Sequence, residues 1–219
     1  MTLVLVAHGT RDPRGAEVVE EIAALVRARL GDVGVEVAYA DVRGPDVASV
    51  LRGIAGGAVV VPAFLAAGYH VRVDVPGQVV ASGHPDVVVT EPIGAALVPV
   101  LRERLKEAGW RPGDAVVLGA AGSSDARALG DVETVGRALG AEVGYVATAA
   151  PSVGDVVAGL KALGRRVAVA SWLLAPGVFQ GRLEGVGADV VAGPIGAHSR
   201  VVEAVLLRYY EARCFLQVA

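Results

Sequence analysis

Four sequence blocks recur in the same order in the two halves of this 219-residue chain, and this repeat constrains the fold more than any other feature. The paired blocks are 7–14 with 120–127, 37–41 with 143–147, 62–70 with 171–179, and 91–94 with 193–196. A repeat at nearly constant offset indicates two homologous structural units. We therefore expect two similar halves, 1–109 and 113–219, joined by a connector over 110–113.

Short apolar runs alternate with longer segments of helical period. Apolar strands separated by helices are typical of parallel sheets that are covered on both faces. The sequence thus predicts an α/β protein in which each half is a parallel sheet flanked by helices, with the active site in a cleft between the halves. The expected strands are 2–7, 34–40, 57–63, 86–90, 114–120, 142–148, 166–172 and 188–192.

Composition narrows the range of partners and compartments. The chain is 53% hydrophobic and has a net charge of −3; without a basic cluster, this argues against nucleic acid as a partner. The single cysteine, Cys214, excludes an internal disulfide and fits a reducing compartment. We find no targeting segment and no apolar stretch of the roughly 20 residues that span a bilayer. We expect a cytoplasmic protein with no membrane partner, and a monomer because its two halves are fused.

Histidines follow two of the expected strands in the first half. His8 comes directly after strand 2–7, and His70 follows strand 57–63 and a short loop, while Asp41 follows strand 34–40. Ligands of open parallel sheets bind outside the carboxyl ends of the strands. In the second half, the positions equivalent to these three residues are occupied by Ala121, Ala147 and Phe179. We therefore expect one metal or proton-transfer site, built by the N-terminal half, with the C-terminal half as the opposite cleft wall.

The three side chains suit a particular kind of metal. Imidazole nitrogen and carboxylate oxygen bind first-row divalent ions such as Fe²⁺ and Co²⁺, and Ni²⁺ also accepts this set. The chain lacks the paired cysteines and the His-Glu-x-x-His pattern of common zinc sites, so a closed structural zinc site is not expected. We take His8, Asp41 and His70 as candidate metal ligands and catalytic residues.

Cationic residues flank the histidines. Guanidinium groups pair with carboxylates in a bidentate manner, so a ring of arginines suits a polyanionic substrate. Thr10 and Tyr69 stand next to the same motifs. The candidate substrate-binding residues are Thr10, Arg11, Arg14, Tyr69 and Arg72.

Other polar residues receive structural interpretations. Asp12 is expected to stabilise its loop or the following helix start, and Asp74 before Val75-Pro76 resembles a helix N-cap. His84 lies in a turn and His198 opens the last helix, so both are expected to be structural or exposed. Core packing is the expected role of Trp172.

Two sequence blocks of the first half resemble a known family. His8-Gly9-Thr10-Arg11-Asp12-Pro13 and the pattern Pro62-x-Phe64-Leu65-x-x-Gly68-x-His70-x-x-x-Asp74-x-Pro76 are similar to the signatures of the sirohydrochlorin chelatases, the class II tetrapyrrole chelatases. The resemblance implies insertion of Co²⁺ or Fe²⁺ into sirohydrochlorin for cobalamin or sirohaem synthesis, without a nucleotide. It also implies that His8 and His70 are metal ligands or bases. Asp41 stands where the family usually has glutamate.

Other functions remain open at this stage. A carrier that binds metal or tetrapyrrole without catalysis would use the same residues. A histidine phosphatase would place His8-Gly9 after a first strand, but such enzymes have an arginine where this chain has Ala7. A periplasmic-type binding protein is disfavoured because no signal peptide is visible. The chain also lacks the glycine-rich nucleotide loops that would follow a first strand.

Overall fold

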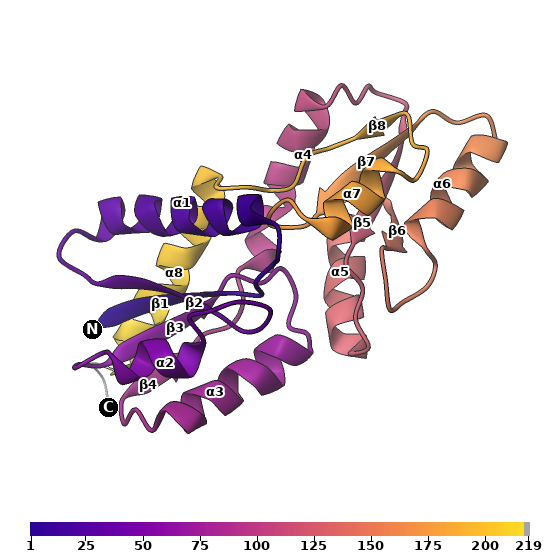
Figure 1. The fold of residues 1–219 in the computed structure, drawn as a ribbon. Coiled ribbons are helices and arrows are strands. Elements are labelled where there is room, and N and C mark those ends of the chain that lie inside the picture. The colour runs from indigo at the N-terminus through magenta and orange to yellow at the C-terminus, as the bar shows by residue number, and fades with distance from the viewer. Residues whose placement is uncertain (217–219) are drawn as a thin grey trace. The chain divides into compact units, whose positions relative to one another are not determined.

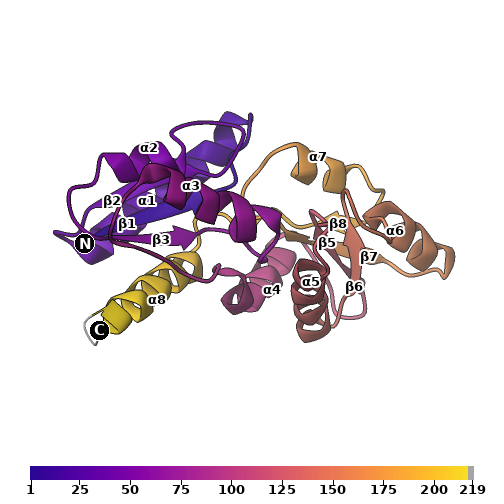
Figure 2. The same cartoon turned by 90° about the horizontal axis from the view of Figure 1, so that it is seen from below.

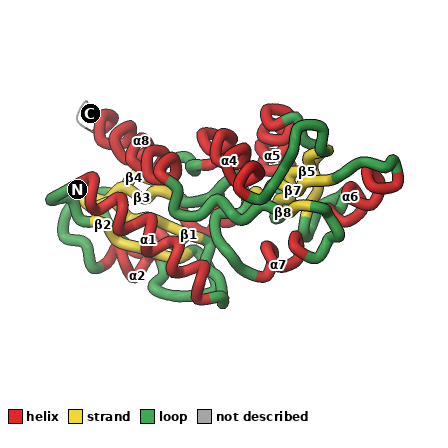
Figure 3. The backbone as a smooth tube through the Cα atoms, turned by 90° about the horizontal axis from the view of Figure 1, so that it is seen from above, coloured by secondary structure: helices red, strands yellow, loops and turns green. Residues whose placement is uncertain are grey.

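The computed structural model describes residues 1–216 and contains two four-stranded parallel sheets (Figures 1 and 3). All eight strands predicted from the sequence are present, most of them one or two residues shorter at an end. The strands are β1 (Thr2–Ala7), β2 (Val35–Tyr39), β3 (Ala58–Pro62), β4 (Val87–Val89), β5 (Ala115–Ala120), β6 (Glu142–Tyr145), β7 (Val167–Trp172) and β8 (Val190–Val191).

Helices separate the strands. None of the helices described is both long and apolar enough to cross a membrane. The helical elements are α1 (Pro13–Leu30), α2 (Val47–Arg52), the π-helical turn η1 (His70–Asp74), α3 (Val75–Ser82), the 3₁₀ turn η2 (Gly94–Leu97), α4 (Val98–Glu107), α5 (Ala126–Leu139), α6 (Val153–Ala162), α7 (Val178–Glu184) and α8 (Ser199–Leu216).

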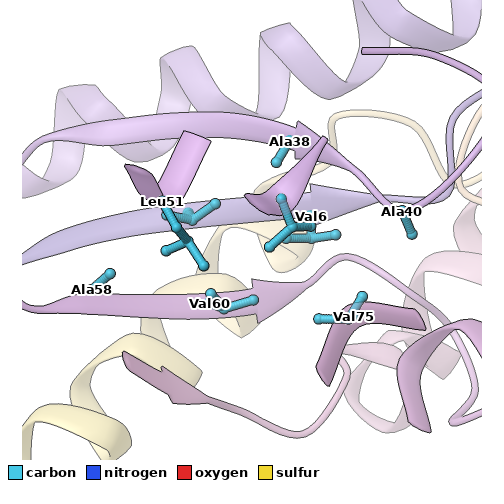
Figure 4. Packing of buried hydrophobic residues seen from close by; sticks show 9 residues of the cluster. Val6, Ala38, Ala40, Leu51, Ala58, Val60 and Val75 are labelled. Atoms are coloured by element: carbon cyan, nitrogen blue, oxygen red, sulfur yellow. The ribbon is translucent and has the colours of Figure 1, made fainter. Parts of the chain in front are cut away.

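The first sheet has the order β2-β1-β3-β4, with every pairing parallel. Side chains alternate between its faces, so Val6, Ala38 and Val60 point to one side and pack against α2 and α3 through Leu51 and Val75 (Figure 4). The opposite face is covered by α1 and α8, which contact each other and the sheet. Burial on both faces explains why the strands are apolar along their whole length.

The second sheet repeats this plan with the order β6-β5-β7-β8. Val117 and Val169 pack on one face against Val157 of α6 and Leu183 of α7. Helices α4 and α5 contact each other and the sheet. The fold therefore matches the predicted pair of similar α/β halves.

The boundaries between the halves differ from the sequence prediction. One compact unit comprises 1–94 with 197–219, and the other comprises 95–196. Helix α4 follows the first sheet in the chain but packs on β7, whereas α8 follows the second sheet but packs on β3 (Figures 1 and 2). The units do not divide at the predicted 109–113, because α4 belongs to the second unit and α8 to the first. Segment 110–113 links α4 to β5 within one unit.

Candidate active site

His8 and His70 meet at the carboxyl edge of the first sheet. Strands β1 and β3 are parallel neighbours, and each histidine follows the carboxyl end of one of them. The imidazole centroids are 4.4 Å apart, with the ring planes nearly perpendicular at 83°. His8 is exposed and His70 is one-third exposed. The structure therefore brings together two side chains that are 62 residues apart in the sequence.

In both imidazoles, Nδ1 forms a local hydrogen bond. Nδ1 of His8 lies 3.0 Å from the carbonyl oxygen of Gly9, which can only accept a hydrogen bond. Nδ1 of His70 lies 2.5 Å from a carboxylate oxygen of Asp74. Each neutral imidazole therefore carries its proton on Nδ1 and leaves the Nε2 lone pair available. Both rings can accept a proton or bind a metal ion through Nε2.

Asp74 occupies the expected N-cap position of α3, but its side chain has a second partner that the sequence analysis did not predict. It stands at the start of α3 but makes no capping bond there, because its carboxylate instead pairs with His70 one turn earlier. The spacing of four residues places both side chains on one face of the helical turn. That i,i+4 spacing, together with the common pairing of ligand histidines with carboxylates, is the signal that could have found it.

Asp41 does not join the histidines. Its carboxylate accepts a hydrogen bond from the backbone N–H of Val42 at 2.7 Å, while its own N–H donates to the carbonyl of His8 at 3.0 Å. Within 1–216, no three histidine, cysteine or acidic side chains gather around a point where one ion could bind. The structure therefore does not place Asp41 in a three-residue cluster with the histidines, and its role as a ligand stays a prediction. Adjacent strand ends bring these backbones together, but the local turn sets the direction of the carboxylate.

Thr10 and Arg14 are occupied within the loop before α1. The Thr10 hydroxyl accepts from the N–H of Asp12 at 3.1 Å, and Asp12 caps α1 by accepting from the N–H of Arg14 at 3.0 Å. The Arg14 guanidinium forms a two-point pair with that carboxylate, at 3.1 and 2.7 Å. These bonds from Arg14 hold the pKa of Asp12 below its usual value. The structural role expected for Asp12 is confirmed.

The other candidate substrate-binding residues lie on the surface around the histidines. Arg11 is exposed beside the His8 loop. Arg72 is on η1 and donates from Nε to the carbonyl of Ala67 at 2.7 Å. Tyr69 is 57% exposed, and its ring centroid lies 6.2 Å from that of His70. All three stay candidate substrate contacts.

The remaining histidines have local roles. His84 borders a cavity of about 430 Å³ where β3 and β4 begin, at the opposite edge of the sheet. Its Nδ1 accepts from the N–H of Asp86, and its Nε2 donates to the carbonyl of Ile54, both at 3.2 Å. Nδ1 of His198 accepts from the N–H of Arg200 as α8 begins. Trp172 is buried, as expected of a core residue.

Comparison with known proteins places the chain in a family. The family model CbiX matches residues 2–108. A protein described as sirohydrochlorin cobaltochelatase from Methanothermobacter thermautotrophicus is 30% identical over 131 residues, which cover 48% of this chain and 91% of the relative. The chain belongs to the CbiX family of sirohydrochlorin chelatases.

Other CbiX relatives extend the comparison. A sirohydrochlorin cobaltochelatase from Methanosarcina acetivorans is 33% identical over 79 residues, and the match spans 34% of this chain and 61% of the relative. A solved structure, SirB from Bacillus subtilis with Fe³⁺, has a TM-score of 0.80 at 21% identity and covers 96% of this chain and 95% of its own. At that identity the structural match supports the fold alone, and the two-unit fold is thus shared along nearly the whole chain.

Proposed function

We propose that this protein inserts Co²⁺ or Fe²⁺ into sirohydrochlorin. The observation that carries the proposal is the facing pair of imidazoles, His8 and His70, each with Nδ1 engaged and Nε2 available. Membership of the CbiX family supplies the reaction, since curated relatives are named for cobalt insertion into this tetrapyrrole.

The reaction needs both functions of imidazole. Sirohydrochlorin and a divalent ion give the metallated tetrapyrrole and two protons, because both pyrrole N–H groups lose their hydrogen as the metal enters. The neutral imidazole presents an Nε2 lone pair that can first bind the incoming metal or accept a pyrrole proton. No oxidant, reductant or nucleotide enters this balance.

The surroundings of the histidines suit the substrate. Sirohydrochlorin is flat, apolar at its centre and carboxylated around its rim. Tyr69 offers an exposed aromatic ring and Arg11 an exposed guanidinium, while Arg72 adds a further positive charge on η1. A guanidinium repels a metal cation and attracts carboxylates. We assign these three residues to the tetrapyrrole and the two histidines to the metal.

The site is assigned to the first unit alone. Ala121, Ala147 and Phe179 stand at the repeat positions of His8, Asp41 and His70. None of them can coordinate a metal ion. The second half is thus a degenerate copy with respect to metal chemistry.

Anaerobic incubation with sirohydrochlorin tests the proposal. Purified protein is mixed with excess substrate and either Co²⁺ or Fe²⁺, and the absorbance change of insertion is followed against a protein-free control. We expect several turnovers per chain with at least one metal. Saturable binding of the tetrapyrrole without accelerated insertion would instead support a carrier and contradict catalysis.

A further inference from the structure

The loops after β1 and β2 have the same backbone as their counterparts after β5 and β6. Gly9 and Gly122 have φ values of 96° and 92°. At both places a side chain on the glycine would collide with a carbonyl oxygen across the loop, that of Asp41 or that of Ala147. The N–H of Asp41 donates to the carbonyl of His8, and the N–H of Ala147 donates to the carbonyl of Ala121, both at 3.0 Å. Side chains in the two halves can therefore be compared position by position.

Some side chains occur in both loops with similar interactions. A hydroxyl accepts from the N–H of the capping aspartate, the aspartate caps the next helix, and an arginine two residues later pairs with it. Because the second half has no histidines at its strand ends, these shared residues serve to build the helix start. The pairs are Thr10 with Ser123, Asp12 with Asp125, and Arg14 with Arg127.

Other side chains of these loops occur only in the first half, and Arg43 is one of them. It is two residues beyond Asp41, and the corresponding residue of the second half is Ala149. The backbone turn is nevertheless the same, since the N–H of each donates to the carbonyl two residues earlier, at 2.8 and 2.7 Å. The loop therefore does not need an arginine at this position for its own structure.

Arg43 lies beside the histidine loop, with its guanidinium over the ring of Tyr39. Its guanidinium carbon lies 5.1 Å from the ring centroid of Tyr39. Its Cγ lies 3.4 Å from the point that a Cβ on Gly9 would occupy, directly next to His8. Arg43 is exposed, and in the described part of the chain it forms no ion pair. A cation–π contact favours this position of the guanidinium and leaves its N–H donors available.

We propose that Arg43 binds a rim carboxylate of the tetrapyrrole substrate. This inference rests on the proposed function and adds a binding residue to it. The fixed fork of donors can form a two-point pair with a carboxylate, and the position next to Gly9 places that pair at the edge of the histidine site. Arg14, by contrast, has its fork engaged by Asp12.

Tetrapyrrole binding by variants tests this assignment. The affinity for metal-free sirohydrochlorin is measured by fluorescence titration for the wild type, R43A and R43K, with R127A as a control that removes the same charge from the second half. We expect R43A to weaken binding about tenfold, the scale of one charge-assisted hydrogen-bonded pair. R43K should recover only part of the affinity, because lysine keeps the charge but lacks the fork.

The outcomes separate this inference from the proposed function. In R43A, the KM for Co²⁺ should stay within about twofold of the wild-type value, since the role concerns the tetrapyrrole. Wild-type binding in R43A, or an equal loss in R127A, would overturn the role of Arg43 and leave the chelatase proposal standing. A wild-type protein that neither binds nor metallates sirohydrochlorin would overturn both. Circular dichroism and Tm verify that each variant is folded.

Discussion

The chemistry available to each imidazole depends on what its second nitrogen contacts. A backbone carbonyl accepts from His8, and the Asp74 carboxylate accepts from His70. Both contacts favour the same tautomer, with Nε2 as the free nitrogen. A carboxylate also restrains ring orientation more firmly than a neutral acceptor, because charge-assisted bonds are the stronger kind. His70 is thus the more fixed of the two side chains.

We expect His8→Ala and His70→Ala each to abolish metal insertion without unfolding the protein. Both side chains lie outside the core at strand ends, so their removal leaves no internal cavity. Insertion rates measured anaerobically should fall to the uncatalysed level, while Tm stays within a few degrees of the wild type. Near-wild-type turnover in either variant would refute the assignment.

Asp74→Ala should lower metal affinity or insertion rate about 10- to 100-fold, the usual effect of losing a carboxylate behind a ligand histidine. Because Asp74 acts through His70, the same substitution in a His70→Ala background should cause no further loss of metal affinity. Nitrogen NMR of the His70 ring should also show a mixture of tautomers in Asp74→Ala. Equal losses in both backgrounds would mean that Asp74 has a separate role.

At the scale of elements, polar side chains tie neighbouring segments together where strands begin. Asp189, just before β8, accepts from the N–H of Val167 at 2.9 Å and pairs with Lys161 at 3.4 Å. Asp114 plays a similar part before β5, where it accepts from the N–H of Arg111 at 2.8 Å and pairs with Arg166. These bonds lie at the amino ends of the strands of the second sheet and support the register of that sheet.

The Asp189 contact predicts a pH dependence of stability. The bond from Val167 lowers the pKa of Asp189 below its ordinary value of 3.8, partial burial opposes this, and Lys161 adds to the lowering. The resulting stabilisation is complete above the unfolded pKa and is lost as pH falls through about 4 toward the folded pKa. Asp189→Asn should therefore lower Tm at pH 7, and the difference should shrink below pH 4. A Tm difference that is constant with pH would contradict this.

Helix α8 supplies a second prediction at this scale. Tyr209 is fully buried, and its hydroxyl donates to the carbonyl of Met1 at 3.3 Å. Tyr209→Ala should cost about 3–5 kcal/mol, the usual effect of deleting a buried aromatic ring. Hydrogen exchange should show the loss in β1 and β3, although Tyr209 follows β8 in the chain. Tyr209→Phe is the mild control, and preferential loss of protection in β5 and β7 would contradict the helix exchange.

The whole molecule is a repeat in which both halves keep the same backbone plan, whereas the side chains at the strand ends differ. Both units keep the strand order, the glycine turns and the helix starts. Only the first keeps histidines at its strand ends. The second half keeps the same loop backbone without the histidines. The fold therefore needs the loops but does not need the histidines.

One metal equivalent per chain follows from this asymmetry. Anaerobic titration with Co²⁺ should saturate at about one equivalent, and His8→Ala should weaken binding sharply because two imidazoles leave few ligands to spare. Two tight equivalents in the wild type would show that the second half also holds metal. A matched titration of Phe179→Ala should leave the stoichiometry unchanged.

Hydrophobic period, turn residues and the internal repeat determined a large part of this protein from the sequence. They predicted the eight strands, the two parallel sheets and the convergence of His8 with His70, because these depend on local patterns and on the shared edge of parallel strands. The strand predicted over 142–148 ends at Tyr145, since the chain then enters a turn in which Thr148 has a φ of 64°.

Tertiary structure alone decided the rest. The sequence shows that α4 is amphipathic but not which sheet covers its apolar face, because either sheet offers a similar surface. The directions of Asp41 and Asp74 were likewise open, since a carboxylate turns toward the nearest donor that the folded backbone provides: the Val42 N–H for one and the His70 ring for the other. Patterns along the chain specify which segments become elements. Helix partners and side-chain directions depend on contacts between residues distant in sequence, which exist only in the folded state.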